Sequence, residues 1–385
     1  MSNLFARWKR KKEERSNRDL SIPFVTIGLA LFGVLMVYSS SQYIAKTQYG
    51  DRFFFAKKQL FGVVVGIVVF FLMGKIPIQF LKNQKFCWIF YGVSLLLLSL
   101  VFVPGIGKSN YGATRWIGFG GFTIQPSEIA KYSLVLLVSA ILSKDMGKAR
   151  TVKRVIPVLL SGGIVCVLIM LEPNMSVTMC VGIVLIAMLF LGGAKMGFFI
   201  AVGIPLLIAV PVLIAIEPYR LSRLSAFLDP FASPKEEGYQ LIQSLYALGN
   251  GGWFGVGLFE SRQKYLFLPF AESDFILSII GEEFGFFGII VLLSTSFFLI
   301  YKGIRIALRA EGFFEYLLAM GITLVYGTQT LINGLVVSGG IPPTGIPLPL
   351  ISSGNTSIII TMAGMGVLYR LSKSTKEGKN SYNRT

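Results

Sequence analysis

The chain lacks histidine altogether and carries few acidic residues. Of its 385 residues none is His, 19 are Asp or Glu, and 36 are Lys or Arg. Imidazole is therefore excluded as a general base or a metal ligand, and these roles fall to a small set of carboxylates. Only three cysteines are present, Cys87, Cys166 and Cys180. All three lie inside apolar runs, which indicates buried apolar residues without disulfides.

Charged residues of both signs are also scarce, since they make up 14% of the chain against 54% hydrophobic residues. No ordinary soluble domain has this composition. A run of about 20 apolar residues crosses the hydrocarbon core of a bilayer. Such runs recur at 23–43, 57–74, 86–104, 126–143, 155–172, 174–193, 196–216, 274–301, 313–337 and 353–371. The sequence therefore predicts an all-α polytopic plasma-membrane protein with about ten transmembrane helices.

Basic residues set the expected orientation, because Lys and Arg near the ends of spans are retained in the cytoplasm. They cluster before residue 22 and after residue 370, and much of the net charge of +17 reflects this bias. Both termini are therefore expected to be cytoplasmic. The basic N-terminus lacks a small-residue cleavage site and predicts an uncleaved first span. No aromatic-interleaved binding fold accompanies it, so a nucleic-acid partner is not expected.

This topology divides the chain into a cytoplasmic basic N-terminus (1–22), a membrane domain (23–371) and a cytoplasmic tail (372–385). A large outer loop, 217–273, connects spans 7 and 8. Within it, residues 239–248 have an amphipathic helical period typical of an interfacial helix. Five glycines between 249 and 257 follow, either for close packing or for close approach to a ligand. The Pro-rich stretch 338–357 cannot be a continuous helix and predicts a partly inserted loop that lines a cavity.

Asp274 is the residue that most needs an explanation. A lone carboxylate at the mouth of an apolar span is costly unless it is used, although an N-cap role is the alternative. Basic residues suited to phosphate or diphosphate oxygens are expected on the same outer face: Lys108, Arg115, Lys131, Arg220, Arg223, Arg262 and Lys264. A lipid carrying a diphosphate is the ligand that this set favours.

Several of these residues also have purely structural interpretations. Arg115 could anchor the chain at the interface beside Trp116, and Arg220 and Arg223 could reach lipid headgroups. Lys131 lies three residues after Glu128 and could pair with it inside the bundle. Two further acids in the eighth span, Glu282 and Glu283, are expected to partner an Arg or Lys.

The ordered motifs of the chain resemble the SEDS family (shape, elongation, division and sporulation proteins), with the FtsW and SpoVE branches closest around Ser261–Lys264. The matching residues are Arg115-Trp116-Ile117, Gln125-Pro126-Ser127-Glu128 with Lys131, Tyr219-Arg220 with Arg223, Gly238-Tyr239-Gln240 with Gln243-Ser244, Ser261 with Gln263-Lys264, Leu268-Pro269, Asp274-Phe275-Ile276, Glu282-Glu283, Pro343-Thr344-Gly345 and Leu348-Pro349 with Ser352.

The resemblance implies a lipid II glycosyltransferase that releases undecaprenyl diphosphate, acting in cell division or sporulation. It implies Asp274 as the catalytic base. Substrate-binding residues would be Arg115, Lys131, Arg220, Arg223, Gln243, Gln263, Lys264 and Ser352. Expected partners are lipid II, a class B penicillin-binding protein transpeptidase and other divisome or cell-wall synthesis proteins. No organic cofactor is implied, and a divalent cation (Mg or Mn) stays open.

Three departures from the family pattern stand out, one of them at 352–356, which reads Ser-Ser-Gly-Asn-Thr in place of the usual Ser-Tyr-Gly-Gly-Ser. Glu272 occupies a position where the family often has His; a second carboxylate would raise the pKa of Asp274 or help to bind a metal. The corner 172–176 reads Glu-Pro-Asn-Met-Ser in place of the usual Gln-Pro-Asp-x-Gly-Thr. A lipid II flippase and a non-catalytic scaffold for a transpeptidase are the alternative functions. A flippase would show ionisable residues through the midplane and inverted repeats, neither of which is evident.

Overall fold

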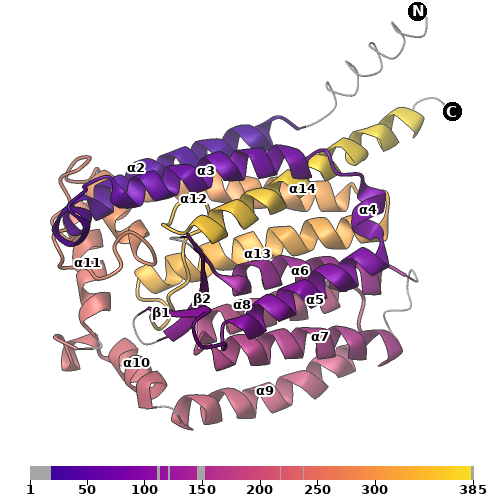
Figure 1. Ribbon diagram of the computed structural model, residues 1–385, viewed down its shortest axis with the longest axis horizontal. Coiled ribbons are helices and arrows are strands. Elements are labelled where there is room, and N and C mark those ends of the chain that lie inside the picture. Colours follow the sequence, from indigo (N-terminus) through magenta and orange to yellow (C-terminus); the bar gives the residue numbers. More distant parts are fainter. Residues whose placement is uncertain are drawn as a thin grey trace, which may run out of the picture.

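A computed structural model describes residues 19–110, 113–119, 122–144, 152–216, 218–236 and 238–382. Helices dominate it (Figure 1). In chain order the elements are α2 Ser21–Tyr49, α3 Phe54–Met73, α4 Ile78–Lys82, α5 Gln84–Leu100, β1 Gly107–Asn110, β2 Ala113–Phe119, β3 Phe122–Ile124, α6 Pro126–Leu142, α7 Val152–Leu171, α8 Met175–Leu191, α9 Met196–Ile216, α10 Pro218–Leu228, the 3-10 helix η1 Pro230–Ala232, α11 Tyr239–Gly251, α12 Ile276–Leu308, α13 Phe313–Val337 and α14 Asn355–Tyr382.

The helices coincide closely with the predicted apolar runs, each of which overlaps one long helix. Among the described residues, α2, α3, α12 and α13 are long and apolar enough to cross a membrane. The helical class is thus confirmed, and the amphipathic segment is α11 as expected. Most of the predicted N-terminal segment 1–22 lies outside the described residues.

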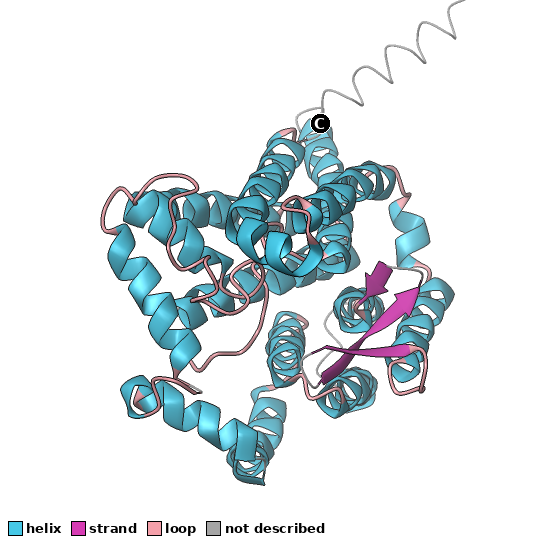
Figure 2. Cartoon of the chain, turned by 60° about the vertical axis from the view of Figure 1, so that its left-hand side comes forward, coloured by secondary structure: helices cyan, strands magenta, loops and turns pink. Residues whose placement is uncertain are grey.

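One element was not predicted, a small antiparallel sheet of order β1-β2-β3 between α5 and α6. Lys108 pairs with Trp116 across β1 and β2, and Ile117 pairs with Ile124 across β2 and β3. Figure 2 shows the strands lying across the ends of neighbouring helices. The sheet matters because β2 presents Arg115.

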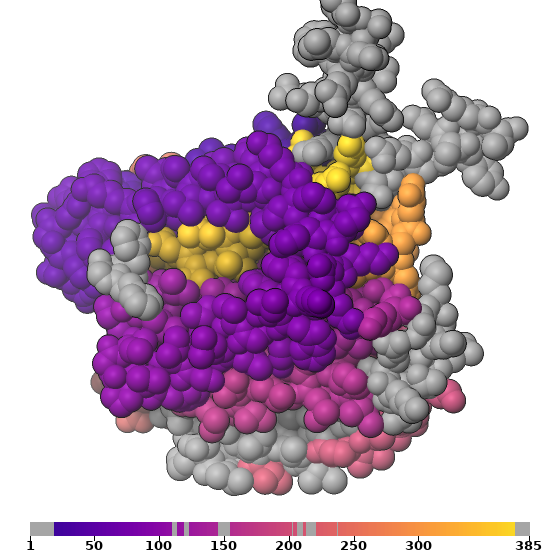
Figure 3. All heavy atoms as spheres, turned by 45° about the vertical axis from the view of Figure 1, so that its right-hand side comes forward, coloured from indigo at the N-terminus to yellow at the C-terminus, as the bar shows by residue number. Residues whose placement is uncertain are grey.

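Helix α13 forms the centre of the bundle. It packs against α6, α8, α12 and α14. Of the residues in its most apolar stretch 67% are buried, whereas in the corresponding stretches of α2, α3 and α12 the buried share is 22–39%. Helix α3 lies along α14, which comes to the surface as a yellow band beside the N-terminal helices (Figure 3). The outer sides of α2, α3 and α12 expose large apolar side chains, as lipid-facing helices do.

The chain between α9 and α12 gathers at one end of the bundle, opposite the end where α2 begins and α14 finishes (Figure 1). Two glycines of the cluster there, Gly251 and Gly255, serve close packing: at Gly255 a Cβ would lie 2.2 Å from the carbonyl oxygen of Glu283 on α12. Helix α12 has a non-helical residue, Gly285 (φ 68°), where this loop meets it. Residues 338–354 contain no regular helix, as predicted.

Candidate active site

Asp274 lies in the turn that precedes α12. The N-cap position of that helix belongs to Phe275, and no described side chain caps it. The N-cap interpretation of Asp274 is therefore wrong. Its carboxylate instead faces the Pro-rich loop, because a Cβ placed on Gly345 would lie 3.1 Å from Asp274 Oδ2. Gly345 has a φ of +71°, so both the backbone conformation and the space favour glycine at this position.

Hydrogen bonds from three residues tie the turn before α12 to the Pro-rich loop. Asn333, fully buried on α13, donates from Nδ2 to the carbonyls of Asp274 and Ile346, each at 2.8 Å. Ser352 donates from Oγ to the Ser273 carbonyl at 2.6 Å. The Ser353 amide donates to the Glu272 carbonyl at 2.9 Å. The carboxylate is thus held by a backbone that two loops and one helix fix together.

The electrostatic setting suits a base. Asp274 is half-buried. Its pKa is raised to about 6, mainly by burial and also by the Glu272 carboxylate, while Arg115 and Arg223 act in the opposite direction. The expected effect of Glu272 on the pKa of Asp274 is therefore confirmed. Burial also raises the pKa of Glu272.

Two of the predicted cations, Arg115 and Arg223, act electrostatically on this carboxylate, and each is anchored on the backbone. Arg115 on β2 donates from Nε to the Glu172 carbonyl at 3.2 Å and from Nη2 to that of Pro173. Arg223 on α10 donates from Nη1 to the Pro343 carbonyl at 2.9 Å. The sheet and α10 therefore supply, from distant parts of the sequence, two cationic side chains that act electrostatically on Asp274.

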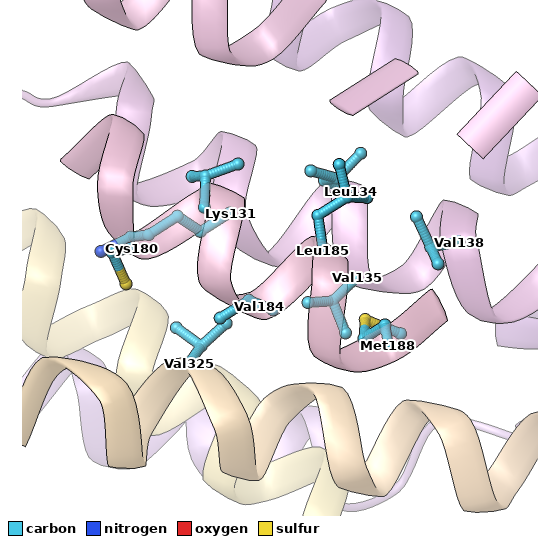
Figure 4. Close-up of a pocket in the computed structure, with 10 residues that line it drawn as sticks. Lys131, Leu134, Val135, Val138, Cys180, Val184, Leu185, Met188 and Val325 are labelled. Carbon is cyan, nitrogen blue, oxygen red and sulfur yellow. The ribbon is translucent and has the colours of Figure 1, made fainter. Parts of the chain in front are cut away.

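Lys131 belongs to the helical core. Its Nζ lies 2.6 Å from Glu128 Oε1, and both side chains are 1% exposed. Figure 4 shows its chain beside Cys180 and Val184 in a small cavity of about 10 Å³ between α6, α8 and α13. The internal Glu–Lys pair, the structural alternative for Lys131, is therefore confirmed.

Lys264 is also in a buried ion pair. Its Nζ lies 3.1 Å from Glu283 Oε1 with both side chains fully buried, and it donates to the Phe259 carbonyl at 2.5 Å. Ser39 on α2 donates to the same Glu283 oxygen at 2.6 Å. The prediction that the acids of the eighth span would partner a cation is confirmed for Glu283.

The neighbouring acid, Glu282, binds the loop itself. It accepts bonds from Ser261 Oγ at 2.5 Å and from the amide of Gln263 at 3.3 Å. The Gln263 side chain is buried, and its Oε1 has no hydrogen-bond partner among the described residues. Together Glu282 and Glu283 fix the segment 261–264 against α12.

The remaining predicted residues are less directly connected with Asp274. Gln243 is half-buried on α11. Ser352 serves the loop, since its hydroxyl also accepts from the Leu348 amide at 2.8 Å. Arg220 lies on α10, but its side chain lies outside the described residues.

Two features of the site carry no strong signal in the sequence. Asn333 could have been noticed only as an amide within an apolar helix, where a polar group needs a partner. A metal-binding cluster is not found: across the residues that the structure describes, no three Asp, Glu or Cys side chains lie close enough together to hold a metal ion. Glu272 and Asp274 are the carboxyls of the site itself.

Comparison with known proteins places these residues in a family. The family model described as a cell cycle protein, FtsW/RodA/SpoVE, matches residues 19–377. A probable peptidoglycan glycosyltransferase FtsW of Geobacter sp. (strain M18) is 38% identical, covering 92% of this chain and 96% of the relative. Stage V sporulation protein E of Bacillus subtilis (strain 168) is 36% identical, covering 94% of this chain and 99% of the relative.

Solved structures agree with these relatives. A chain from the structure entitled "Structural coordination of polymerization and crosslinking by a peptidoglycan synthase complex" superposes with a TM-score of 0.76 at 26% identity, covering 93% of this chain and 98% of that one. The rod shape determining protein RodA of Thermus thermophilus shares the fold, with a TM-score of 0.67 at 24% identity over 92% of this chain and 96% of its own. The chain is a membrane protein of the FtsW/RodA/SpoVE family of cell cycle proteins.

Proposed function

We propose that the protein is a peptidoglycan glycosyltransferase that polymerises lipid II at the plasma membrane, in cell division or sporulation. Relatives named as such enzymes align with nearly the whole chain. The observation that carries the mechanism is the Asp274 carboxylate, held at the mouth of α12 beside two arginines.

In the proposed reaction Asp274 is the general base. Its carboxylate takes the proton of the acceptor 4-hydroxyl, and that oxygen forms a bond to the anomeric carbon of the donor. The bond between this carbon and the diphosphate oxygen breaks, and undecaprenyl diphosphate leaves with the electron pair. A pKa of about 6 leaves Asp274 ionised at neutral pH and more basic than an ordinary aspartate, which is the tuning that general bases need.

The departing diphosphate gains negative charge and needs cations. Arg115 and Arg223, which act electrostatically on Asp274, are the residues that we assign to it, because guanidinium groups suit phosphate oxygens. Arg220, Gln243 and Gln263 stay as candidates for the rest of the substrate. Lys131 and Lys264 are assigned to the buried pairs that hold the helices and the outer loop.

The membrane arrangement follows from the same assignment. Ten long helices would cross the bilayer, with the segment 217–273 and the Pro-rich loop on the outer face. Both termini would then be cytoplasmic, consistent with α2 beginning and α14 ending at the same end of the bundle (Figure 1). A class B penicillin-binding protein is the proposed transpeptidase partner, since a similar chain occurs in a peptidoglycan synthase complex.

Polymerisation of purified lipid II by the protein reconstituted with such a transpeptidase tests the proposal. Wild type should form glycan chains and Asp274→Ala should not. The assay run with and without chelator tests for a divalent cation. Movement of labelled lipid II across vesicles without polymer would instead identify a flippase, and full activity of Asp274→Ala would exclude Asp274 as the base.

A further inference from the structure

Glu172 is a second buried acid near the site. It follows the last residue of α7, at the corner before α8, and its exposed fraction is 1%. Neither of its carboxyl oxygens has a hydrogen-bond partner among the residues that the structure describes. Buried carboxylates are normally paired or hydrogen-bonded, so this side chain needs a reason to carry an acid.

The corner itself does not depend on the acid. Asn174 accepts from the Val177 amide at 3.4 Å and so caps α8, while Arg115 binds the main-chain carbonyls of Glu172 and Pro173. These contacts hold the corner through its backbone and through Asn174. The Glu172 carboxyl group is therefore available for another role.

Arg115 connects the two acids. It acts electrostatically on the Glu172 carboxyl and also on Asp274. The other charged groups that act on Asp274 are Glu272 and Arg223. Within the described part of α8, the first turn brings polar but uncharged residues to the corner. Arg115 thus interacts electrostatically with both carboxyl groups, and its guanidinium is bound to the corner that carries Glu172.

We propose that Glu172 is a positioning residue whose carboxyl group controls Arg115 by gaining or losing one proton. With the proton bound, Glu172 is neutral and the guanidinium remains directed to Asp274 and the anionic substrate. When the proton leaves to solvent, the new carboxylate competes for the guanidinium and weakens its interaction with the leaving diphosphate. The inference rests on the proposed function, since it assigns regulation to the same site.

The pKa of Glu172 is raised, as this role requires. This pKa is raised to about 8, because burial raises it by more than the Arg115 charge lowers it. The side chain therefore carries its proton at neutral pH and loses it in mildly alkaline solution. Below about pH 8 the arrangement is competent, and above it the competing carboxylate appears. The polymerisation rate should then fall as the pH rises, because Glu172 loses its proton.

The test is the pH profile of lipid II polymerisation, by the full chain reconstituted with its transpeptidase, from about pH 6 to 9.5. Wild type should lose about tenfold in rate for each pH unit above the Glu172 pKa. Glu172→Gln, which stays neutral, should keep the neutral rate within about twofold and lose this alkaline decline. Glu260→Gln, at an exposed loop position, is the matched control and should keep the decline.

The outcomes separate the two proposals. If wild type makes no polymer at any pH, the proposed function fails and this inference fails with it. If wild type is active and Glu172→Gln shows the same alkaline decline, only the role of Glu172 is overturned.

If Glu172→Gln fails to fold, two measurements replace it. The uncharged Glu172→Met should also lose the decline. The infrared carbonyl band of a protonated carboxyl group should be present in wild type at neutral pH and vanish across the Glu172 pKa. Absence of any such titrating band would overturn the proposal.

Discussion

Asn333 offers a sharp test of how the site is held. Its Nδ2 donates to the carbonyls of Asp274 and Ile346 at 2.8 Å each, and the side chain is fully buried. Asn333→Leu keeps a similar volume but removes both donors. Each buried carbonyl left without a donor costs about 1–3 kcal/mol, so the junction loses about 2–6 kcal/mol. The two segments should then separate, and displacement of a catalytic group by about 1 Å costs about 100-fold in rate.

The assay is the initial rate of lipid II polymerisation at saturating substrate, with thermal unfolding in detergent measured alongside. Thr330→Val is the matched control, because Thr330 lies one turn earlier on α13 and is 1% exposed, and among the described residues its hydroxyl bonds within its own helix, to Tyr326 O at 2.9 Å. The control should retain most of the wild-type rate. A rate for Asn333→Leu within about twofold of wild type would refute the reasoning that this amide positions Asp274.

Three further results are expected. Gly345→Ala should lower the polymerisation rate by about 100-fold, since the new Cβ would lie 3.1 Å from Asp274 Oδ2 at a φ of +71°; an unchanged rate would contradict this packing. The rate should fall about tenfold per pH unit below the Asp274 pKa of about 6, because protonation removes the base. A polymerisation rate that does not change with pH down to about pH 5 would show that the rate-limiting step does not need an ionised carboxylate, which would contradict the role of Asp274 as base. Lys264→Met should destabilise the fold by about 3–5 kcal/mol by leaving Glu283 charged and buried, and Lys264→Met/Glu283→Gln should recover part of this loss in thermal unfolding. No recovery in the double variant would show that the pair is not coupled.

The helices could be predicted because their signal is local. An apolar run long enough to span a bilayer forms a helix there, because the helix satisfies its own backbone hydrogen bonds. For this reason α6, predicted as 126–143, is found at Pro126–Leu142. The sheet β1-β2-β3 was missed because its strands are only three to seven residues long, so that pairing between them, rather than periodicity, defines it. Strands of this kind have no pattern that a single sequence exposes.

The site was predictable only in part, for a related reason. Asp274 stands out because a carboxylate in an apolar context is costly. The basic residues could not be sorted by type alone: Arg115 and Arg223 act electrostatically on Asp274, whereas Lys131 and Lys264 neutralise buried acids. That division depends on which helix faces meet. The partner of Lys264 comes from α12 and is joined there by Ser39 of α2, a contact between segments far apart in the sequence.

The most direct test of the account compares wild type with Asp274→Asn, which keeps the shape of the side chain and removes its basicity. Both proteins are reconstituted with the transpeptidase, and lipid II binding and polymerisation are measured on the same samples. The account predicts that Asp274→Asn binds lipid II about as well as wild type and polymerises it about 100-fold or more slowly. Polymerisation by Asp274→Asn at the wild-type rate would contradict it.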